Sequence, residues 1–194
     1  MLEVNEIFGP TIQGEGKLIG SPSIFIRFGK CNFKCVGFNV EYETPSGVKK
    51  CACDSYYAVD MEFKDSWKSY ENHLDIVNIT NKLLENYSYK NSVDVVITGG
   101  EPLLQLDTAL IAALHQHGFR IAVETNGTIA PPPGVDWLCV SPKLGSTLVV
   151  NSGQELKLVY PQDGGDPAQF AHLAFDNFYL QPMDSPQQGE NTAK

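Results

Sequence analysis

Cysteine is the residue type whose spacing in this chain most directly suggests chemistry. Four of the five cysteines lie between Cys31 and Cys53. Iron–sulfur clusters are held by cysteine thiolates, and Cys31 and Cys35, with three residues between them, could place two ligands on one loop. A third ligand would come from Cys51 or Cys53. Three protein ligands leave one iron of a four-iron cluster open, while a structural zinc site made of all four thiolates is the alternative.

A second group of chemistry-bearing residues consists of short polar segments that follow apolar runs. Gly99 and Gly100 have no Cβ, so their backbone can approach a ligand closely, although the pair is also suited to an ordinary turn. Carboxylates, amides and lysines occupy the other segments. The five segments are Gly29-Lys30-Cys31, Gly99-Gly100-Glu101-Pro102, Glu124-Thr125-Asn126-Gly127, Ser141-Pro142-Lys143 and Gln181-Pro182-Met183.

The elements that must position these segments follow from the apolar pattern. Short β-rich runs alternate with helix-like segments, which is typical of a parallel sheet with crossover helices. Because reactive residues gather at the C-terminal ends of parallel strands, the five segments should meet at one face. The fold class expected is α/β, a single-domain incomplete TIM-like barrel of mainly parallel strands with crossover helices. The expected strands are 23–28, 93–98, 120–124, 136–140, 155–160 and 177–180.

Two helices are expected, at 74–86 and 107–117. Asp107 is a suitable N-cap for the second, and Gly118 stands where a left-handed residue would end it. In the first helix, helical spacing predicts one apolar face made of Leu74, Val77, Leu83 and Leu84.

Composition and charge restrict the class of function. The 194 residues, 42% of them hydrophobic, suffice for one core. A formal net charge of -9 without clustered Lys and Arg opposes binding to nucleic acid. The N-terminal residues lack a signal-peptide pattern, and no apolar run is long enough for a membrane span. The expected compartment is therefore the cytoplasm, where thiols stay reduced, which favours metal ligands over disulfides; Cys139, in an apolar run, is expected to be a buried core thiol.

Taken together, the motifs resemble those of a known enzyme family. Cys31 and Cys35, then Cys53-Asp54-Ser55 and Thr98-Gly99-Gly100-Glu101-Pro102, are similar to the cluster loop and GGEP element of radical S-adenosylmethionine (SAM) enzymes. The opening Glu6-Ile7-Phe8-Gly9-Pro10-Thr11-Ile12-Gln13-Gly14-Glu15-Gly16, with Ser141-Pro142-Lys143 and Leu180-Gln181-Pro182-Met183-Asp184, narrows the resemblance to the 7-carboxy-7-deazaguanine synthase family. The resemblance extends from about residue 3 to residue 186.

The resemblance implies three cofactors: a 4Fe-4S cluster, SAM and Mg²⁺. The cluster ligands would be Cys31, Cys35 and Cys53, because Cys53, unlike Cys51, precedes a pair similar to the family's Asp-Thr. Ser55 would be the magnesium ligand, since Mg²⁺ prefers oxygen. The implied SAM contacts are Gly99, Gly100, Glu101, Glu124, Asn126, Ser141, Lys143 and Gln181. Taken alone, Glu101 could be a solvated helix-start carboxylate and Asn126 part of a turn.

The implied reaction converts 6-carboxy-5,6,7,8-tetrahydropterin to 7-carboxy-7-deazaguanine with loss of ammonia, in the biosynthesis of queuosine-type 7-deazapurines. The substrate contacts would be Ile12, Gln13, Gly14, Glu15, Arg27 and Thr98. Arg27 is suited to the substrate carboxylate, with a structural ion pair as the alternative. A flavodoxin- or ferredoxin-type reductant and a homodimer are also implied. The rival functions are a glycyl-radical-type activating enzyme and a non-catalytic iron–sulfur or zinc binding module.

The chain departs from the family pattern in two places. Seventeen residues separate Cys35 from Cys53 instead of the usual two, which predicts an insertion in the cluster loop at 36–50, as a hairpin or loop. The expected radical SAM domain covers residues 1–186, and 187–194 are expected to form a disordered tail. The segment that closes the substrate pocket in the family lies beyond this point, so partly uncoupled cleavage of SAM, with 5′-deoxyadenosine exceeding the deazaguanine product, is expected.

Overall fold

The computed structural model describes residues 1–36, 38, 40–43, 47–51, 53–88 and 92–193. All six expected strands are present, as β2, β6, β7, β8, β9 and β10, and both expected helices are present, as α2 and α3. The strands are β1 (Leu2–Ile12), β2 (Pro22–Phe28), β3 (Glu41–Glu43), β4 (Lys49–Cys51), β5 (Lys68–Tyr70), β6 (Asp94–Gly99), β7 (Arg120–Thr125), β8 (Trp137–Val140), β9 (Ser152–Tyr160) and β10 (Ala174–Pro182). The helices are α1 (Tyr56–Val59), α2 (His73–Leu83), α3 (Thr108–Gln116) and α4 (Gln188–Thr192), with 3₁₀ turns η1 (Met61–Ser66), η3 (Pro102–Leu104) and η4 (Pro167–Gln169).

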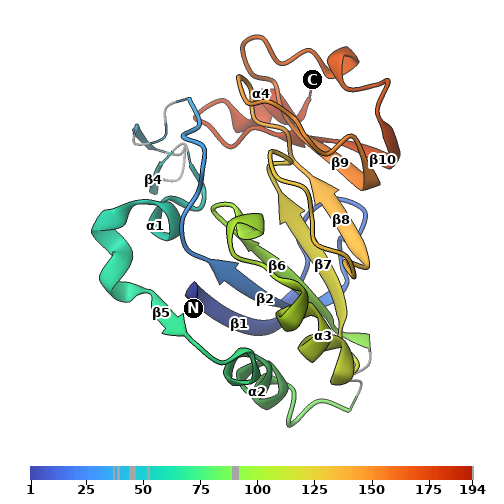
Figure 1. Ribbon diagram of the computed structural model, residues 1–194. Helices are drawn as coiled ribbons and strands as arrows, with labels where there is room; N and C mark the ends of the chain where they lie inside the picture. Colours follow the sequence, from blue (N-terminus) through green and yellow to red (C-terminus); the bar gives the residue numbers. More distant parts are fainter. Residues whose placement is uncertain (37, 39, 44–46, 52, 89–91, 194) are drawn as a thin grey trace.

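One eight-stranded sheet organises the molecule, in the order β10-β9-β8-β7-β6-β2-β1-β5 (Figure 1). The parallel neighbours in this sheet are β2 with β6, β6 with β7, β7 with β8, β8 with β9, and β9 with β10. Strand β1 pairs antiparallel with both β2 and β5. The fold is therefore α/β with a mainly parallel sheet, as expected. Its described strands form an open sheet with β10 and β5 at the edges.

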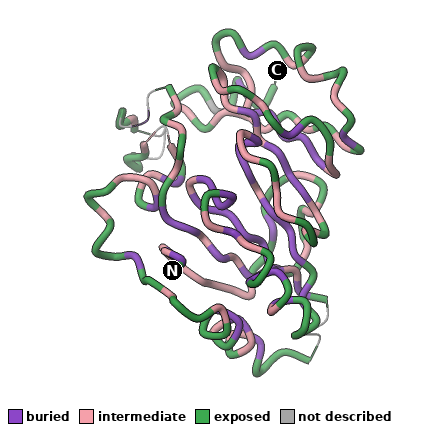
Figure 2. The backbone as a smooth tube through the Cα atoms, viewed as in Figure 1, coloured by how far each residue is buried: buried purple, intermediate pink, exposed green. Residues whose placement is uncertain are grey.

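The core lies around the central strands, which are buried along most of their length (Figure 2). In β6, the consecutive residues Val95, Val96 and Ile97 are all buried, so both faces of the sheet are covered there. Helices α2 and α3 pack against each other and against β1 and β7. No helix in the described part of the chain is long and apolar enough to cross a membrane.

The structure corrects the expected face of α2. Leu74 is 48% exposed, and the buried positions of this helix are Ile76, Val77 and Thr80. The helix begins at His73, after Asn72, whose side chain accepts a hydrogen bond from the Leu74 backbone N–H. Leu74 therefore lies in the first turn, on the side away from the core.

Strands β1 and β5 were not expected from the sequence. Gly9 and Pro10 interrupt the apolar pattern of β1, and β1 accommodates them through irregular pairing with β2 between Phe8 and Thr11. The strand β5 is only Lys68–Tyr70 and pairs with the start of β1.

Two segments that the family pattern set apart have structure of their own. In the predicted insertion, β3 and β4 pair as an antiparallel hairpin, while its positions 37, 39 and 44–46 lie outside the described residues. Residues 187–194, expected to be disordered, contain α4. The side chain of Asn191 donates to the Met183 carbonyl oxygen at 3.0 Å, which ties this helix to the end of β10; Lys194 is outside the described residues.

Candidate functional site

The C-terminal ends of the parallel strands bring several predicted loops together at one edge of the sheet. Gly100 after β6 lies so close to the loop after β2 that a Cβ there would overlap the carbonyl oxygen of Lys30. Asn126, after β7, donates from Nδ2 to Oδ1 of Asn32 at 3.1 Å. The expected meeting of loops is therefore confirmed for β2, β6 and β7.

Three of the cysteines share this edge. The thiols of Cys31, Cys35 and Cys53 lie close enough to influence one another's ionisation. Burial raises the pKa of all three, and that of Cys53 to about 11. Lys143, from the loop after β8, opposes the rise at Cys31 and Cys35, so a cation lies beside these thiols. Among the described residues, no three Cys, His, Asp or Glu side chains are close enough to hold a single metal ion.

Glu101 is fully buried and binds its own neighbours. Its Oε1 accepts from the Leu103 backbone N–H at 2.9 Å and from the Thr125 hydroxyl at 2.7 Å. Its Oε2 accepts from the Asn126 backbone N–H at 2.7 Å. Burial raises the pKa of Glu101, although these donors oppose the rise. A helix-start carboxylate is the correct description, since Glu101 caps η3, but this carboxylate is not solvated.

The other residues expected to contact SAM are distributed over this edge and over one face of the sheet. Lys143 donates from Nζ to Oγ of Ser141 at 2.9 Å, so these two form one group. Gln181 lies on the edge strand β10, opposite Val159. Glu124, also expected to contact SAM, has its carboxylate in contact with Gln13 and Thr98, which are expected to bind the substrate.

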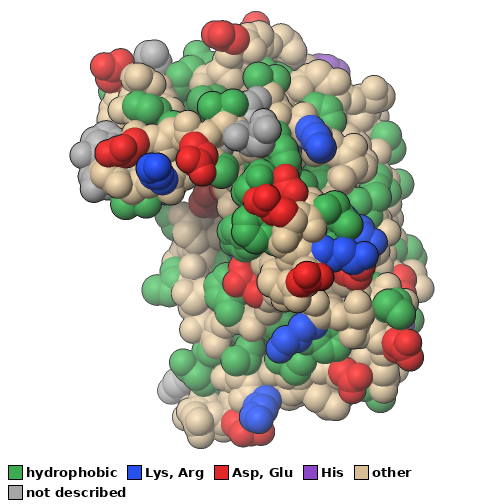
Figure 3. All heavy atoms as spheres, turned by 90° about the vertical axis from the view of Figure 1, so that its left-hand side faces the viewer, with side chains coloured by type: hydrophobic (Ala, Val, Ile, Leu, Met, Phe, Trp, Pro, Cys, Tyr) green, Lys and Arg blue, Asp and Glu red, His purple; other side chains and the backbone are tan. Residues whose placement is uncertain are grey.

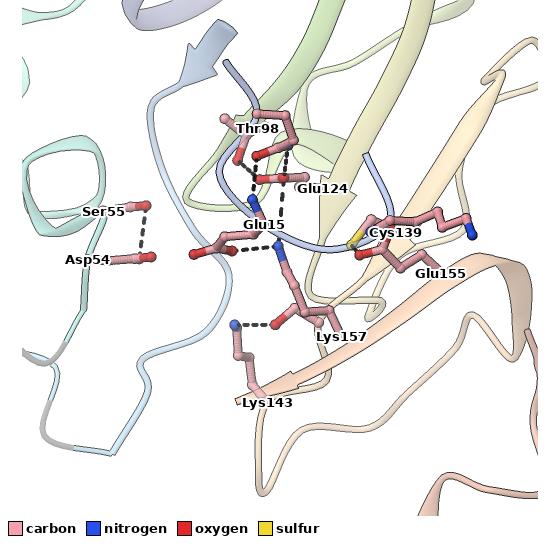
Figure 4. Close-up of polar contacts among 12 residues, drawn as sticks. Glu15, Asp54, Ser55, Thr98, Glu124, Cys139, Lys143, Glu155 and Lys157 are labelled. Carbon is pink, nitrogen blue, oxygen red and sulfur yellow. Dashed lines mark hydrogen bonds and ion pairs between the residues drawn. The ribbon is translucent and has the colours of Figure 1, made fainter. Parts of the chain in front are cut away.

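Glu124 is the centre of a polar network on one face of the sheet (Figure 4). Gln13 donates from Nε2 to Glu124 Oε1 at 2.9 Å, and the Thr98 hydroxyl donates to Glu124 Oε2 at 3.2 Å. The structure thus unites Gln13 and Thr98, which are far apart in sequence, through a carboxylate from β7. Ile12 and Gly14, beside Gln13, are both exposed.

Glu15 and two residues of β9 complete this face. Glu15 Oε2 lies 2.7 Å from Nζ of Lys157, and Lys157 Nζ lies 3.8 Å from Glu124 Oε1. The carboxylate of Glu155 accepts from the Lys17 backbone N–H at 3.1 Å and from the Cys139 thiol at 3.5 Å. Cys139 is buried, as expected.

Lys157 and Glu155 were missed from the sequence. Both are almost completely buried in β9, where they alternate with the apolar Leu156 and Leu158. Charged residues that alternate with leucines in an expected strand are usually solvated, and here they face the loop between β1 and β2 instead. An acid and a lysine two residues apart, in a strand that ends beside the other polar segments, is the signal that could have indicated them.

Arg27 has a partner within the protein. Its Nε lies 2.8 Å from Glu6 Oε1, its Nη1 donates to the Ser55 hydroxyl at 3.3 Å, and its guanidinium lies 5.7 Å from the Tyr57 ring centroid. Ser55 also donates to Asp54 Oδ1 at 3.2 Å. The ion pair with Glu6 matches the structural alternative for Arg27, while the contact with Ser55 places the guanidinium beside the cluster loop.

The surface carries charges of both signs. On the face drawn in Figure 3, Lys and Arg side chains are interspersed with Asp and Glu. This distribution agrees with the net charge of -9 and differs from the clustered basic surface with which proteins neutralise phosphates.

Comparisons with known proteins agree with the motifs. The chain is 46% identical over 192 residues to "7-carboxy-7-deazaguanine synthase" from Bradyrhizobium diazoefficiens, which covers 98% of this chain and 87% of the relative. It is 42% identical over 193 residues to the protein of the same name from Bordetella pertussis, again covering 98% of this chain and 87% of the relative. No protein-family model matches the chain.

A solved structure extends the comparison to the fold. The crystal structure of QueE from Escherichia coli superposes with a TM-score of 0.67 at 27% sequence identity, over 99% of this chain and 86% of that one. Since relatives above 40% identity match almost the whole chain and a solved structure shares its fold, this chain belongs to the 7-carboxy-7-deazaguanine synthase family.

Proposed function

We propose that this chain converts 6-carboxy-5,6,7,8-tetrahydropterin to 7-carboxy-7-deazaguanine, with loss of ammonia, in the biosynthesis of queuosine-type 7-deazapurines. The observation that carries the proposal is that two sites lie at the C-terminal ends of neighbouring parallel strands in a chain of this family. One is the group of Cys31, Cys35 and Cys53, and the other is the polar face centred on Glu124. The rival functions are not favoured, because the named relatives are synthases.

The residues at the edge of the sheet fit the cluster and SAM. The three thiols influence one another's ionisation, Lys143 supplies a nearby cation, and Gly100, which has no side chain, lets the loop after β6 pack against Lys30 and Cys31. When bound, the cluster and SAM supply one-electron chemistry that the protein's own side chains lack. A four-iron cluster is larger than one ion, so its ligands need not lie close enough to hold a single metal.

The proposed SAM contacts divide into two roles. Gly99, Gly100, Ser141 and Lys143 are proposed to contact SAM, and so are Asn126 and Gln181. Glu101, whose oxygens already accept three hydrogen bonds, is proposed to hold the Asn126 loop in place. Glu124 is reassigned to the substrate, because Gln13 and Thr98 donate to it.

The proposed substrate contacts surround the polar face. Gln13, Glu15 and Glu124 offer acceptors to the amide and amino groups of the pterin, with Thr98 beside them and with Ile12 and Gly14 at the rim. Arg27 would meet the substrate carboxylate. Ser55 and Asp54 supply oxygens that suit Mg²⁺. The guanidinium of Arg27, which donates to the Ser55 hydroxyl, would lie beside the bound ion.

Several further properties are proposed at family level. We propose that residues 1–186 form an incomplete TIM-like barrel. The proposed partners are a flavodoxin- or ferredoxin-type reductant and a second copy of the chain. The free thiols suit a reducing compartment, so we place the protein in the cytoplasm.

The direct test is turnover after anaerobic reconstitution with iron and sulfide. The protein is incubated with the carboxytetrahydropterin, SAM, Mg²⁺ and a chemical reductant, and the products are identified by mass spectrometry. We expect 7-carboxy-7-deazaguanine, and none from a Cys35→Ala control. Cleavage of SAM without any deazaguanine, in the presence of saturating pterin, would contradict the proposed substrate.

A further inference from the structure

Lys157 is a buried cation between two acids. It lies within β9 and is only 6% exposed. Its Nζ is 2.7 Å from Glu15 Oε2 and 3.8 Å from Glu124 Oε1 (Figure 4). Burial alone would lower the pKa of Lys157, but Glu124, Cys139 and Glu15 together raise it above its ordinary value. A buried lysine is costly unless it is paired, so its two partners determine where it can lie.

The two acids come from opposite parts of the chain. Glu15 belongs to the loop between β1 and β2, and Glu124 to β7 in the centre of the sheet. Without a cation between them, two carboxylates this close to one ammonium would repel each other. Lysine carries donors and no acceptor, so Lys157 contacts both acids through their carboxylate oxygens.

The remaining contacts orient the two carboxylates. Gln13 and Thr98 each donate to Glu124 and fix its plane. The Glu15 side chain is 45% exposed although its Oε2 is held by Lys157, so part of its carboxylate remains accessible to solvent. Because a carboxylate can accept two parallel N–H bonds, it matches a group that carries adjacent donors.

We propose that Lys157 is a positioning and specificity-determining residue, which holds the carboxylates of Glu15 and Glu124 in place as acceptors for the adjacent amide and amino N–H groups of a pterin. This inference rests on the proposed function. A pterin presents N3–H and the 2-amino group side by side. A lumazine, which has a 2-oxo group in place of the amino group, would direct an acceptor at the carboxylates and should be rejected.

The test measures binding without turnover. Fluorescence titration of the full chain with 6-carboxypterin and 6-carboxylumazine, in the absence of SAM, gives two dissociation constants. We expect the wild-type protein to prefer the pterin. Lys157→Met should weaken pterin binding by about tenfold or more and reduce the preference over lumazine, because Glu15 and Glu124 then lose the cation that holds their carboxylates in place. Lys157→Arg, which restores the cation, should recover most of the preference.

Matched variants separate positioning from folding. Arg120→Met removes another paired cation, 2.8 Å from Asp94 at the opposite ends of the strands, and should leave both dissociation constants unchanged. In turnover, Lys157→Met should raise KM much more than it lowers kcat. If Lys157→Met does not fold, Lys157→Gln is titrated in its place. The ratio of the pterin and lumazine dissociation constants is compared, because this ratio does not depend on the folded fraction.

Two results would overturn the inference. One is an unchanged pterin-to-lumazine ratio in the folded Lys157 variant, and the other is failure of the wild-type chain to bind 6-carboxypterin. Product formation by the wild-type protein is measured separately. The wild-type protein can form deazaguanine while the Lys157 variant keeps the wild-type ratio of dissociation constants. That combination would support the proposed function and contradict only the role of Lys157.

Discussion

At the scale of single residues, two neighbouring cysteines have different surroundings. Cys53 lies near Cys35 and Cys31, as the mutual influence of their thiols shows. Cys51 ends β4 and is paired across the hairpin with Glu41. The sequence left both open as the third ligand, and only the resemblance favoured Cys53. The assignment remains a prediction, which the structure supports by placing Cys53 beside the other two thiols.

Replacing each of the two cysteines tests this assignment. Cys53→Ala should lose most of the iron and of the visible absorption after anaerobic reconstitution, because one of three thiolate ligands is gone. Cys51→Ala should retain both signals at nearly the wild-type level. The opposite pattern, with Cys51→Ala losing the iron, would show that the hairpin cysteine is the ligand.

Arg27 is the second residue whose role can be separated by experiment. Arg27→Ala should reduce turnover of the carboxylated pterin by about tenfold or more, which is the usual loss when a charged hydrogen bond is removed. Cleavage of SAM without substrate should change little. Glu6→Gln, which removes only the acid 2.8 Å from Arg27, serves as the control for the ion pair. If Glu6→Gln matches Arg27→Ala in both assays, the ion pair is what matters and Arg27 is structural.

Long-range side-chain contacts explain why some residue roles could not be predicted from the sequence. The spacing of Gly99 and Gly100 after an apolar run predicted a close approach to a ligand, which remains a prediction; the structure shows Gly100 packed closely against the Lys30 backbone. The acid–lysine spacing in β9 could have indicated Lys157, but its partner could not be predicted, because its role depends on a loop from residue 15 lying over β9, about 140 residues further along the chain. Such a long-range contact leaves no periodic pattern in either segment.

At the scale of elements, local capping made α3 predictable to within a residue. Asp107 accepts from the Leu110 backbone N–H at 2.8 Å, and Gly118 has a φ of +80°, as expected for the ends of this helix. By contrast, the apolar face of α2 was wrong at Leu74, because the position of the helix start decides which leucine faces the core. Strand β1 was missed because Gly9 and Pro10 resemble a turn in the sequence.

The N-cap of α3 gives a prediction of stability. Asp107→Ala should lower the free energy of unfolding by about 0.5–2 kcal/mol, whereas Asp107→Asn, which also caps well, should lower it much less. Chemical denaturation at pH 7 measures both. Equal losses would show that the charge, more than the cap, is what stabilises this end of the helix.

The same cap has a defined dependence on pH. Burial alone would raise the pKa of Asp107, but the bond from Leu110 and the proximity of His73 lower it below its ordinary value. A depressed carboxyl pKa contributes stability above the unfolded value, and that contribution is lost as the pH falls through the folded value. The difference between wild type and Asp107→Ala should therefore shrink below about pH 4. The effect is small, since the Asp107 side chain is 48% exposed.

At the scale of the whole molecule, the beginning of the chain covers a face built by its second half. The loop from Gln13 to Ser21 contacts β7 through Glu124 and contacts β9 through Glu155 and Lys157. The sequence predicted that loops at the strand ends would converge, and it did so because parallel topology alone requires this. It did not predict that the first loop would lie over the face, since nothing local to residues 13–21 specifies a partner on β9.

The closure of this loop over β9 depends on Gly16, which provides the last prediction. Gly16 has a φ of +67°, and a Cβ there would overlap the carboxylate of Glu155. That carboxylate cannot move freely, because it is buried and accepts from Lys17 and from Cys139. Gly16→Ala should therefore lift the loop, separate Glu15 from Lys157, and weaken binding of 6-carboxypterin by about tenfold. Gly20→Ala is the matched control, since Gly20 lies in the same loop at a φ of +87° with no atom within 4 Å of its would-be Cβ. Both variants bear the strain of a positive φ, about 1 kcal/mol, so the difference in pterin affinity between them isolates the contact with Glu155. Equal affinities in the two variants would show that the pterin does not require this loop to lie on β9.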